Sequence, residues 1–460
     1  MKHYLIIFIA ATCVGLSSCS IYSSYQAKTD KDVPETLYGD VQLGDSASSI
    51  GNVGWRELFS DPQLQALIDT CLARNVDMQT AYLHIDQANA GLTAARLSYL
   101  PSLAFTPNAA ITKYGIYPES GKVYNLPFTA QWQLDAFGLL RNQHRQQKAT
   151  RDMLQDVAQA VKTGLIGGVA NTYYTLAMLD EQIRIAQETE QTWQQTVKSM
   201  QALMQAGMTN QAGVSQMEAA WHGVHTQLLS LQQSRNEVCN ALSLLLDMPA
   251  GSHTQLAPSL SSFQSPAVLN VGVPCQLLHN RPDVRAAENQ LRAACYANKA
   301  ATSAFFPQLS LTGTFGWTNT DGAGIINPAF TIAQLVGALV QPIFAKGGLR
   351  AQKIAAKDEL KIASLNFQHK LLEAGGEVNN YLDACQKARE KTTALQQQVD
   401  ALQKALNATR LTMQYGNTTH LEVLTAQQSL LSAQLGQVAN RFEEIQAVVN
   451  LYTALGGGRK

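Results

Sequence analysis

The sequence of 460 residues repeats its own plan, and this repeat limits the possible folds more than any other feature. The segment that begins at Asn75 aligns without a gap on the segment that begins at Arg281, at an offset of 206. Two further matches lie at offsets of 208 and 209: GGVANTY on GGEVNNY, and LMQAG on TMQYG. Two halves of roughly 200 residues therefore share one architecture.

Each half contains stretches in which apolar and polar side chains alternate. In QLSLTGTFGWT, from Gln308 to Thr318, the leucines, phenylalanine and tryptophan fall on one side of an extended chain, and serine and threonine on the other. A period of two over about ten residues suits a strand that crosses a membrane in a β-barrel. We expect two hairpins, 102–135 and 308–341, with strands at 102–112, 123–135, 308–318 and 329–341. Several aromatic residues of these hairpins are candidates for an interfacial belt: Tyr114, Tyr117, Tyr124, Trp132 and Trp317.

Long helices are expected after each hairpin, because no proline occurs between Pro127 and Pro249 or after Pro342. We expect helices at 139–206, 211–247, 347–415 and 419–455. In the second helix of each half, stripe positions follow one another at intervals of three and four residues, which predicts coiled-coil packing. The stripe of the second half lies 207 positions after that of the first half, whereas the glycines before the stripes, Gly207 and Gly416, are 209 positions apart. We therefore expect one helical turn to differ between the halves.

The N-terminus has the features of a lipoprotein signal. Lys2 precedes an apolar run from Leu5 to Leu16, which is too short to span a membrane and fits a signal-peptide core at 1–18. The run ends in LSSC, which resembles a bacterial lipobox and implies that Cys19 becomes the lipidated first residue. The alternative is an ordinary cleavage site beside an uninvolved cysteine. No later window offers the ~18 apolar residues of a transmembrane helix.

Charge and cysteine content exclude several classes of function. Lys plus Arg and Asp plus Glu both total 34, so the chain lacks the basic excess of a nucleic-acid-binding protein. The spacing of the 7 cysteines matches no zinc or redox motif, and we expect those after Cys19 to be small buried hydrophobes. HExxH, GxSxG, Walker A and GxGxxG are absent, so we expect neither catalysis nor a cofactor.

Four strands are too few to form a closed membrane barrel. Their edges would leave unpaired N–H and C=O groups in lipid, at several kcal/mol each, and the smallest membrane barrels have about eight strands. The chain must therefore associate with at least one further copy of itself; strand counting alone permits a dimer or a larger assembly.

Five motifs give the chain a resemblance to a known family: LDAFG from Leu134, RPDVRAAENQL from Arg281, AFFPQLSLTGTFG from Ala304, QPIFAKGG from Gln341 and YGNTTHLEVLTAQQSLL from Tyr415. The chain resembles the TolC-type outer-membrane efflux proteins, and within them the NodT-like lipoprotein subclass that serves resistance-nodulation-division (RND) pumps.

The resemblance implies an α+β membrane protein. Three chains would form a 12-stranded β-barrel, four strands per chain, that continues into a coiled-coil α-helical barrel. The chain would contain two repeats, at 61–247 and 276–455, followed by a tail at 456–460. Residues 19–60, before the first repeat, and residues 248–275, between the repeats, would form a small equatorial domain. The implied partners are two further copies, a periplasmic adaptor, an inner-membrane RND transporter and outer-membrane lipid. The implied function is passive export of drugs or other toxic compounds.

The resemblance also implies a pore gate at the periplasmic helix ends, where acidic side chains face the pore. Glu422 matches one acidic position, and a ring of three carboxylates would favour cations. Thr425 falls on the second acidic position and departs from the family pattern. The alternative is that Glu422 is an ordinary acidic residue at a helix start.

Other residues have competing interpretations. Glu218, His222 and His225 share one helix face and could bind a metal ion, but a surface cluster is the favoured interpretation. The glycine pairs at 167–168 and 375–376 could mark hinges, but close packing is the commoner reason for small residues. Asp135 and Gln341 stand at expected strand ends and could be simple turn residues.

Three other functions compete with the efflux duct. A type I protein-secretion duct would share the same fold. A periplasmic adaptor lipoprotein would have one helical hairpin, whereas two are expected here. A lipoprotein hydrolase would need a catalytic constellation, and the motif search finds none.

Overall fold

The computed structural model describes residues 24–27, 33–38, 49–113, 120–252, 256, 258–266, 269–272, 274, 276–319, 331–415 and 420–459. Cys19, Tyr114 and Tyr117 lie outside the described residues, as do the helix-connecting residues 416–419.

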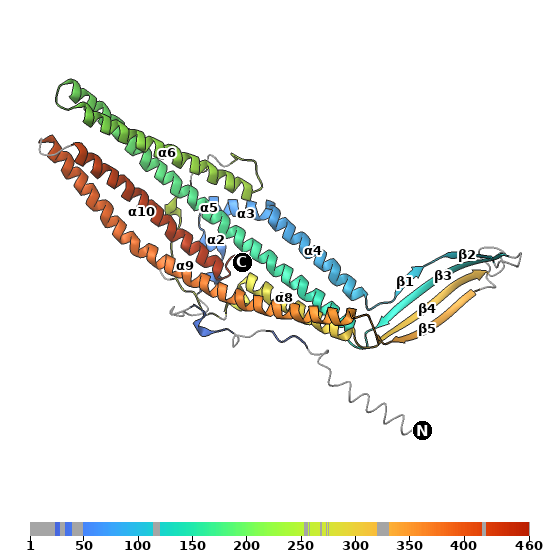
Figure 1. Cartoon of the computed structure of the whole chain (residues 1–460). Coiled ribbons are helices and arrows are strands. Elements are labelled where there is room, and N and C mark those ends of the chain that lie inside the picture. The colour runs from blue at the N-terminus through green and yellow to red at the C-terminus, as the bar shows by residue number, and fades with distance from the viewer. Residues whose placement is uncertain are drawn as a thin grey trace. The chain divides into compact units, whose positions relative to one another are not determined.

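Each half of the chain contains the same succession of elements (Figure 1). In the first half, α3 (Pro62–Arg74) and α4 (Val76–Leu97) precede the strands, and α5 (Leu139–Gln205) and α6 (Gln211–Leu245) follow them. In the second half, α7 (Gln276–Asn280) and α8 (Pro282–Ser303) precede the strands, and α9 (Gly348–Gln414) and α10 (His420–Ala454) follow. Shorter elements are η3 (Glu35–Tyr38), η5 (Ile50–Asn52), α2 (Trp55–Leu58) and η6 (Leu260–Ser262).

A single offset of 209 relates both ends of all four long helices. The helices α5 and α9 both have 67 residues, about 100 Å at 1.5 Å per residue, and α6 and α10 both have 35. The expectation that one helical turn differs between the halves is therefore wrong. The expectation was wrong because the heptad stripe seen in the sequence of α10 does not lie on the face of α10 that packs against α9 but on another face of the same helix. Val423 on the first face packs against α9 with Leu406, whereas Leu431 on the second packs against Trp193 of α5 and Val224 of α6.

The strands form one antiparallel sheet in the order β1-β3-β4-β5, with β2 also paired to β3. The strands are β1 (Ser102–Phe105), β2 (Asn108–Lys113), β3 (Ser120–Leu134), β4 (Gln308–Asn319) and β5 (Thr331–Val340). The single strand expected at 102–112 is thus two strands. Both pair with β3 in one unbroken register, and the gap contains Pro107, which has no N–H to donate to the ladder. The chain consequently supplies four strand positions to the sheet.

The register places the large apolar side chains of the strands on one face of the sheet. Trp132 pairs with Leu311, and Phe128 pairs with Phe315. On β5 the same face carries Leu335 and Leu339, which are 72% and 67% exposed. The other face carries Gln131 and Thr129 opposite Thr312 and Thr314. β5 alternates weakly because Ile332 and Val336 lie on this second face.

The chain divides into two compact units. One contains residues 1–28, 83–156 and 285–370, which include the whole sheet, and the other contains residues 29–82, 157–284 and 371–460. Among the described residues, no helix has both the length and the apolar character needed to cross a bilayer.

Candidate functional site

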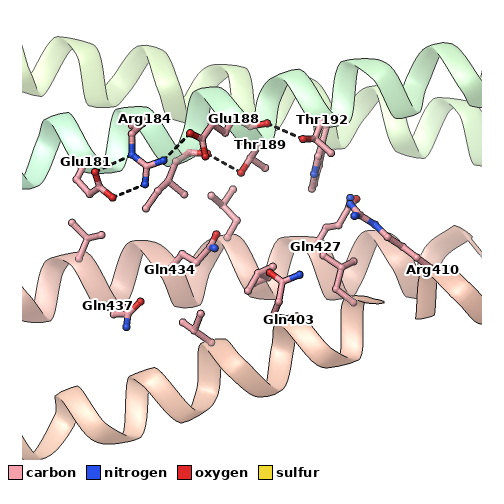
Figure 2. A pocket seen from close by; sticks show the side chains of 17 residues that line it. Glu181, Arg184, Glu188, Thr189, Thr192, Gln403, Arg410, Gln427, Gln434 and Gln437 are labelled. Atoms are coloured by element: carbon pink, nitrogen blue, oxygen red, sulfur yellow. Dashed lines mark hydrogen bonds and ion pairs between the residues drawn. The ribbon is translucent and has the colours of Figure 1, made fainter. Parts of the chain in front are cut away.

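A groove of about 400 Å³ lies between α5 of the first half and α9 and α10 of the second (Figure 2). Its floor includes the buried side chains of Trp193 and Leu431, which are 1% and 5% exposed. Its rim is rich in side-chain amides, and Figure 2 labels four of them on the two second-half helices: Gln403, Gln427, Gln434 and Gln437.

The groove is lined by two anionic and two cationic side chains: Glu181, Glu188 and Arg184 of α5 and Arg410 of α9. Arg184 bonds Glu181 one turn before it, at 2.6 Å, and Glu188 one turn after it, at 2.7 Å. Gln427 is only 6% exposed, and its Oε1 has no hydrogen-bond partner among the described residues. The groove therefore has a neutral, amide-rich lining with an acceptor left to be satisfied.

A second cavity of about 920 Å³ lies where residues 258–264 cross the helices. Two arginines tie this segment to the helices. Arg235 of α6 donates to the Leu256 carbonyl at 2.7 Å while it pairs with Asp180 of α5. Arg389 of α9 donates to Ser265 Oγ at 2.9 Å and pairs with Glu444 of α10.

Glu444 is buried, yet it stays ionised. Burial raises the pKa of this carboxyl, but hydrogen bonds from Ser265 and Arg389 and the charge of Arg441 outweigh burial, so the pKa lies below its ordinary value. Arg441 bonds the carboxylate at 2.6 Å and the Phe263 carbonyl at 3.2 Å. A buried charge of this kind needs such partners, because desolvation alone would neutralise it.

Arg281, the first residue of the RPDV motif, joins three helices. Its guanidinium bonds Asp283 at 2.8 Å and also pairs with Glu377 of α9. It donates to the carbonyls of Ala374 and Ala454 at 3.4 and 3.2 Å. With only 7% of its side chain exposed, Arg281 connects the start of α8 to α9 and to the end of α10.

Asp135 and Gln341, which could be simple turn residues, make side-chain hydrogen bonds to the segments next to their strands. The Asp135 carboxylate accepts hydrogen bonds from the backbone N–H groups of Leu140 and Arg141 at 3.0 and 2.9 Å, which caps the start of α5. The Gln341 amide donates to the Phe305 carbonyl at 2.9 Å, across the base of β4 and β5.

The first glycine of each glycine pair lies at a close approach. A Cβ on Gly167 would lie 2.8 Å from Thr453 Cγ2, and one on Gly375 would lie 2.6 Å from the Leu37 carbonyl oxygen. Gly168 and Gly376 have open space around them. Close packing therefore explains one member of each pair, and for Gly375 the neighbour is η3.

The two residues predicted to form the gate lie near the start of α10. Glu422 lies exposed in the first turn of α10. Thr425, one turn later, donates its hydroxyl to the Leu421 carbonyl at 2.9 Å and is also exposed. The pore itself would be formed between copies of the chain, so the ring of carboxylates stays a prediction.

The residues weighed as metal ligands bond to other partners. Glu218 accepts a hydrogen bond from Gln201 at 2.8 Å, and His225 lies 2.6 Å from Glu190. His222 contacts the ring of Trp221. The part of the chain that the structure describes contains no cluster of three or more His, Cys, Asp or Glu placed to hold a metal ion.

Sequence reasoning missed the two ion pairs beneath the equatorial segment, although a signal exists. Asp180 and Arg389 correspond at the offset of 209, and so do Arg235 and Glu444. The two pairs occupy equivalent positions with opposite charges. Once the offset is known, the signal is that both charges of the pair are reversed between the halves. Two positions whose charges reverse together are expected to be in contact.

The family model described as outer membrane efflux protein matches residues 67–247 and 273–457. The chain is 27% identical to the cation efflux system protein CusC of Escherichia coli O6:H1, with 97% of each chain covered. It is 28% identical to the antibiotic efflux pump outer membrane protein ArpC of Pseudomonas putida, covering 98% of this chain and 95% of ArpC. The open-state crystal structure of the Neisseria gonorrhoeae outer membrane channel MtrE superposes with a TM-score of 0.85, at 26% identity, covering 95% of this chain and 98% of that one.

Proposed function

The chain belongs to the outer membrane efflux protein family, and we propose that it is the exit duct for toxic small molecules in a tripartite pump. It is an outer-membrane channel protein that extends into the periplasm and assembles as a trimer, as its structural relatives do. Three copies bring four strand positions each to one 12-stranded β-barrel, which continues into the helical barrel.

The apolar sheet face is the observation that carries the proposal. Leu103, Leu335 and Leu339 are each more than 60% exposed, and all lie on the face that carries Trp132. A soluble protein rarely exposes such a surface, whereas lipid covers it without cost. The sheet has β1 and β2 at one edge and β5 at the other. The unpaired N–H and C=O groups of these edges can form hydrogen bonds with the edge strands of neighbouring copies.

The conducted compounds are expected to be chemically diverse. The names of similar proteins refer to cations, antibiotics and toluene. The polar face of the sheet is lined by glutamine and threonine, which offer hydrogen bonds but little shape selection. Selection would then belong to the inner-membrane transporter.

The amide-rich groove is the surface that we assign to the periplasmic adaptor. An adaptor helix laid between α5 and α10 would cover the apolar floor at Trp193 and donate to Gln427 Oε1. The inner-membrane RND transporter would supply the energy, and the adaptor would connect it to this duct.

Two further assignments complete the proposal. Cys19 carries the lipid anchor, which places the N-terminus at the periplasmic face of the outer membrane. Glu422, with Thr425 in the second acidic position, forms the pore gate.

Deletion of the gene tests the proposal, with accumulation measured for a panel of dyes, bile salts, antibiotics and metal ions. We expect at least one class to accumulate, and complementation by the intact gene to reverse it. Unchanged accumulation across the panel, in a strain without a second duct, contradicts efflux. Loss of a secreted protein with no change in small-molecule accumulation would instead indicate a type I secretion duct.

A further inference from the structure

Three cationic side chains and a histidine gather where the first-half strands meet the helices. Arg96 lies in the last turn of α4, and His144, Arg145 and Lys148 lie near the start of α5. His144 and Lys148 are one helical turn apart and therefore share a face. Burial lowers the pKa of His144, and so do the charges of Arg96, Lys148 and Arg145, which means that all three cations lie near its ring.

Aromatic residues place this cluster beside the membrane face of the sheet. The ring of Tyr99 meets His144 edge to face, with ring centres 6.1 Å apart. The Trp132 indole N–H donates to the Tyr99 carbonyl at 2.8 Å, and Trp132 lies on the apolar face of β3. Tryptophan and tyrosine collect at the headgroup level of membranes, so the cluster lies where the hydrocarbon layer ends.

The acidic residue near this cluster is held by backbone donors. The nearby Asp135 already accepts the backbone N–H groups of Leu140 and Arg141. Within the described ranges, neither His144 Nε2 nor Arg145 Nη1 has a hydrogen-bond partner, although both atoms are buried. An anion with several acceptor oxygens would satisfy the charge and Arg145 Nη1, and also His144 Nε2 in the tautomer that carries its proton there.

The corresponding junction of the second half is closed by protein contacts. At the offset of 209, Lys353 stands in the place of His144. Its ammonium donates to Asn298 Oδ1 at 2.7 Å and also to Thr302 Oγ1. Thr302 corresponds to Arg96 at the offset of 206. The second-half lysine therefore has protein acceptors. In the first half, the Arg145 guanidinium lies over the Tyr296 ring, with 5.6 Å to the ring centre, and its Nη1 has no hydrogen-bond partner among the described residues.

We propose that the α4–α5 junction, formed by Arg96, His144, Arg145 and Lys148, binds the headgroup phosphate of an anionic phospholipid in the membrane leaflet nearest the helices. The acyl chains of that lipid lie against Trp132 and the apolar face of the sheet. The proposal rests on the membrane position of the sheet and not on which compound the duct conducts.

A neighbouring copy is a poorer occupant than a lipid. If sheets join edge to edge in the trimer, the β5–α9 edge of one copy meets the β1–α4 edge of the next. That edge brings Lys346, Arg350 and Lys357, which are all exposed. A second copy would thus add positive charge beside the cluster, and anionic lipid would balance both.

The lipidated trimer, embedded in nanodiscs of equal phosphatidylglycerol and phosphatidylcholine, tests the proposal. Lipids retained after release into detergent are counted by native mass spectrometry. We expect the wild type to retain phosphatidylglycerol in preference to phosphatidylcholine. In the double variant Arg96→Gln/Lys148→Gln, the ratio of the two retained lipids should fall about fivefold for each charge removed. Lys404→Gln, which removes an exposed charge near the opposite end of α9, should keep the wild-type ratio, as should Arg96→Lys.

Several outcomes overturn the proposal. One is a wild type without preference, which decides the question even if the double variant fails to fold. Another is a folded double variant with wild-type retention. Release of phosphatidylglycerol by inorganic phosphate in the wash would mean a site for free anions. Loss of the trimer in the double variant, with no lipid preference in the wild type, would assign the cluster to contact between copies.

Discussion

Arg235 and Asp180 form an ion pair between α6 and α5 whose charges are reversed in the other half of the chain. The two residues are 55 positions apart, as are Arg389 and Glu444, but in the second pair the arginine comes first. Both arginines also bond the equatorial segment, at Leu256 and at Ser265. The reversal shows that this contact between the two long helices of each half requires opposite charges, with an arginine that reaches the equatorial segment. It does not matter which of the two helices carries the arginine.

Reversal of the first pair should therefore be tolerated better than its loss. We expect Arg235→Ala and Asp180→Ala each to destabilise the protein, and Asp180→Arg/Arg235→Asp to recover part of the loss, with a coupling free energy of about 1–3 kcal/mol. Denaturant unfolding of the detergent-purified protein measures the cycle. A double reversal that is no better than the sum of the single reversals would show that the carbonyl contact of Arg235 dominates.

Arg281 should be among the most sensitive charged residues. Arg281→Met leaves Glu377 and two buried carbonyls without their donor, so we expect a loss of about 3–5 kcal/mol in unfolding free energy. Arg56→Gln is the control, because Arg56 pairs with Asp69 at the surface and should contribute less than about 1 kcal/mol. Equal effects of the two substitutions would contradict the burial argument.

The C-terminal glycines fill space that a side chain cannot share. A Cβ on Gly457 would lie 2.4 Å from the ring of Tyr452, and the Gly457 carbonyl accepts a hydrogen bond from Thr163 at 2.9 Å. We expect Gly457→Ala to cost about 1–3 kcal/mol of stability. Gly436→Ala in α10, where nothing lies within 4 Å, should instead stabilise by about 0.5–1 kcal/mol. Thermal unfolding of both variants at one scan rate provides the comparison.

Stability should fall in acid partly because of Glu444. Its pKa in the folded protein is below the ordinary value, so its contribution is complete above the unfolded pKa of about 4.3 and is lost as the pH falls through the folded pKa. Glu444→Gln should lower stability at neutral pH and flatten the acid limb of the stability profile. Unfolding midpoints measured from pH 7 downward test this, and an unchanged acid limb would assign the loss to other carboxylates.

Charge at the gate should control ion preference. Glu422→Gln should reduce the cation preference of single channels in planar bilayers, and Thr425→Asp should increase it by restoring a second acidic position. Glu443→Gln, which removes a carboxylate that pairs with Lys391 farther along α10, serves as the control. If selectivity is the same in all three variants, Glu422 is an ordinary helix-start charge.

The sequence by itself determined the elements of this protein and their repetition. Period-two alternation predicted the strands, and long stretches without proline predicted helices whose ends lie within two residues of α5, α6, α9 and α10. Such patterns are readable because backbone geometry imposes its period on every exposed or buried face. The need for further copies also followed from strand number alone.

Only the tertiary structure decided which faces meet. The second buried face of α10, the reach of Arg281 to Ala454 and the burial of Gly457 depend on residues far apart in the chain. Local periodicity cannot encode them, because a helix pattern marks a residue as buried without naming its partner. The ion pair of Arg235 with Asp180 belongs to the same class: its charges are visible in the sequence, but their contact arises only when two helices turn back on one another.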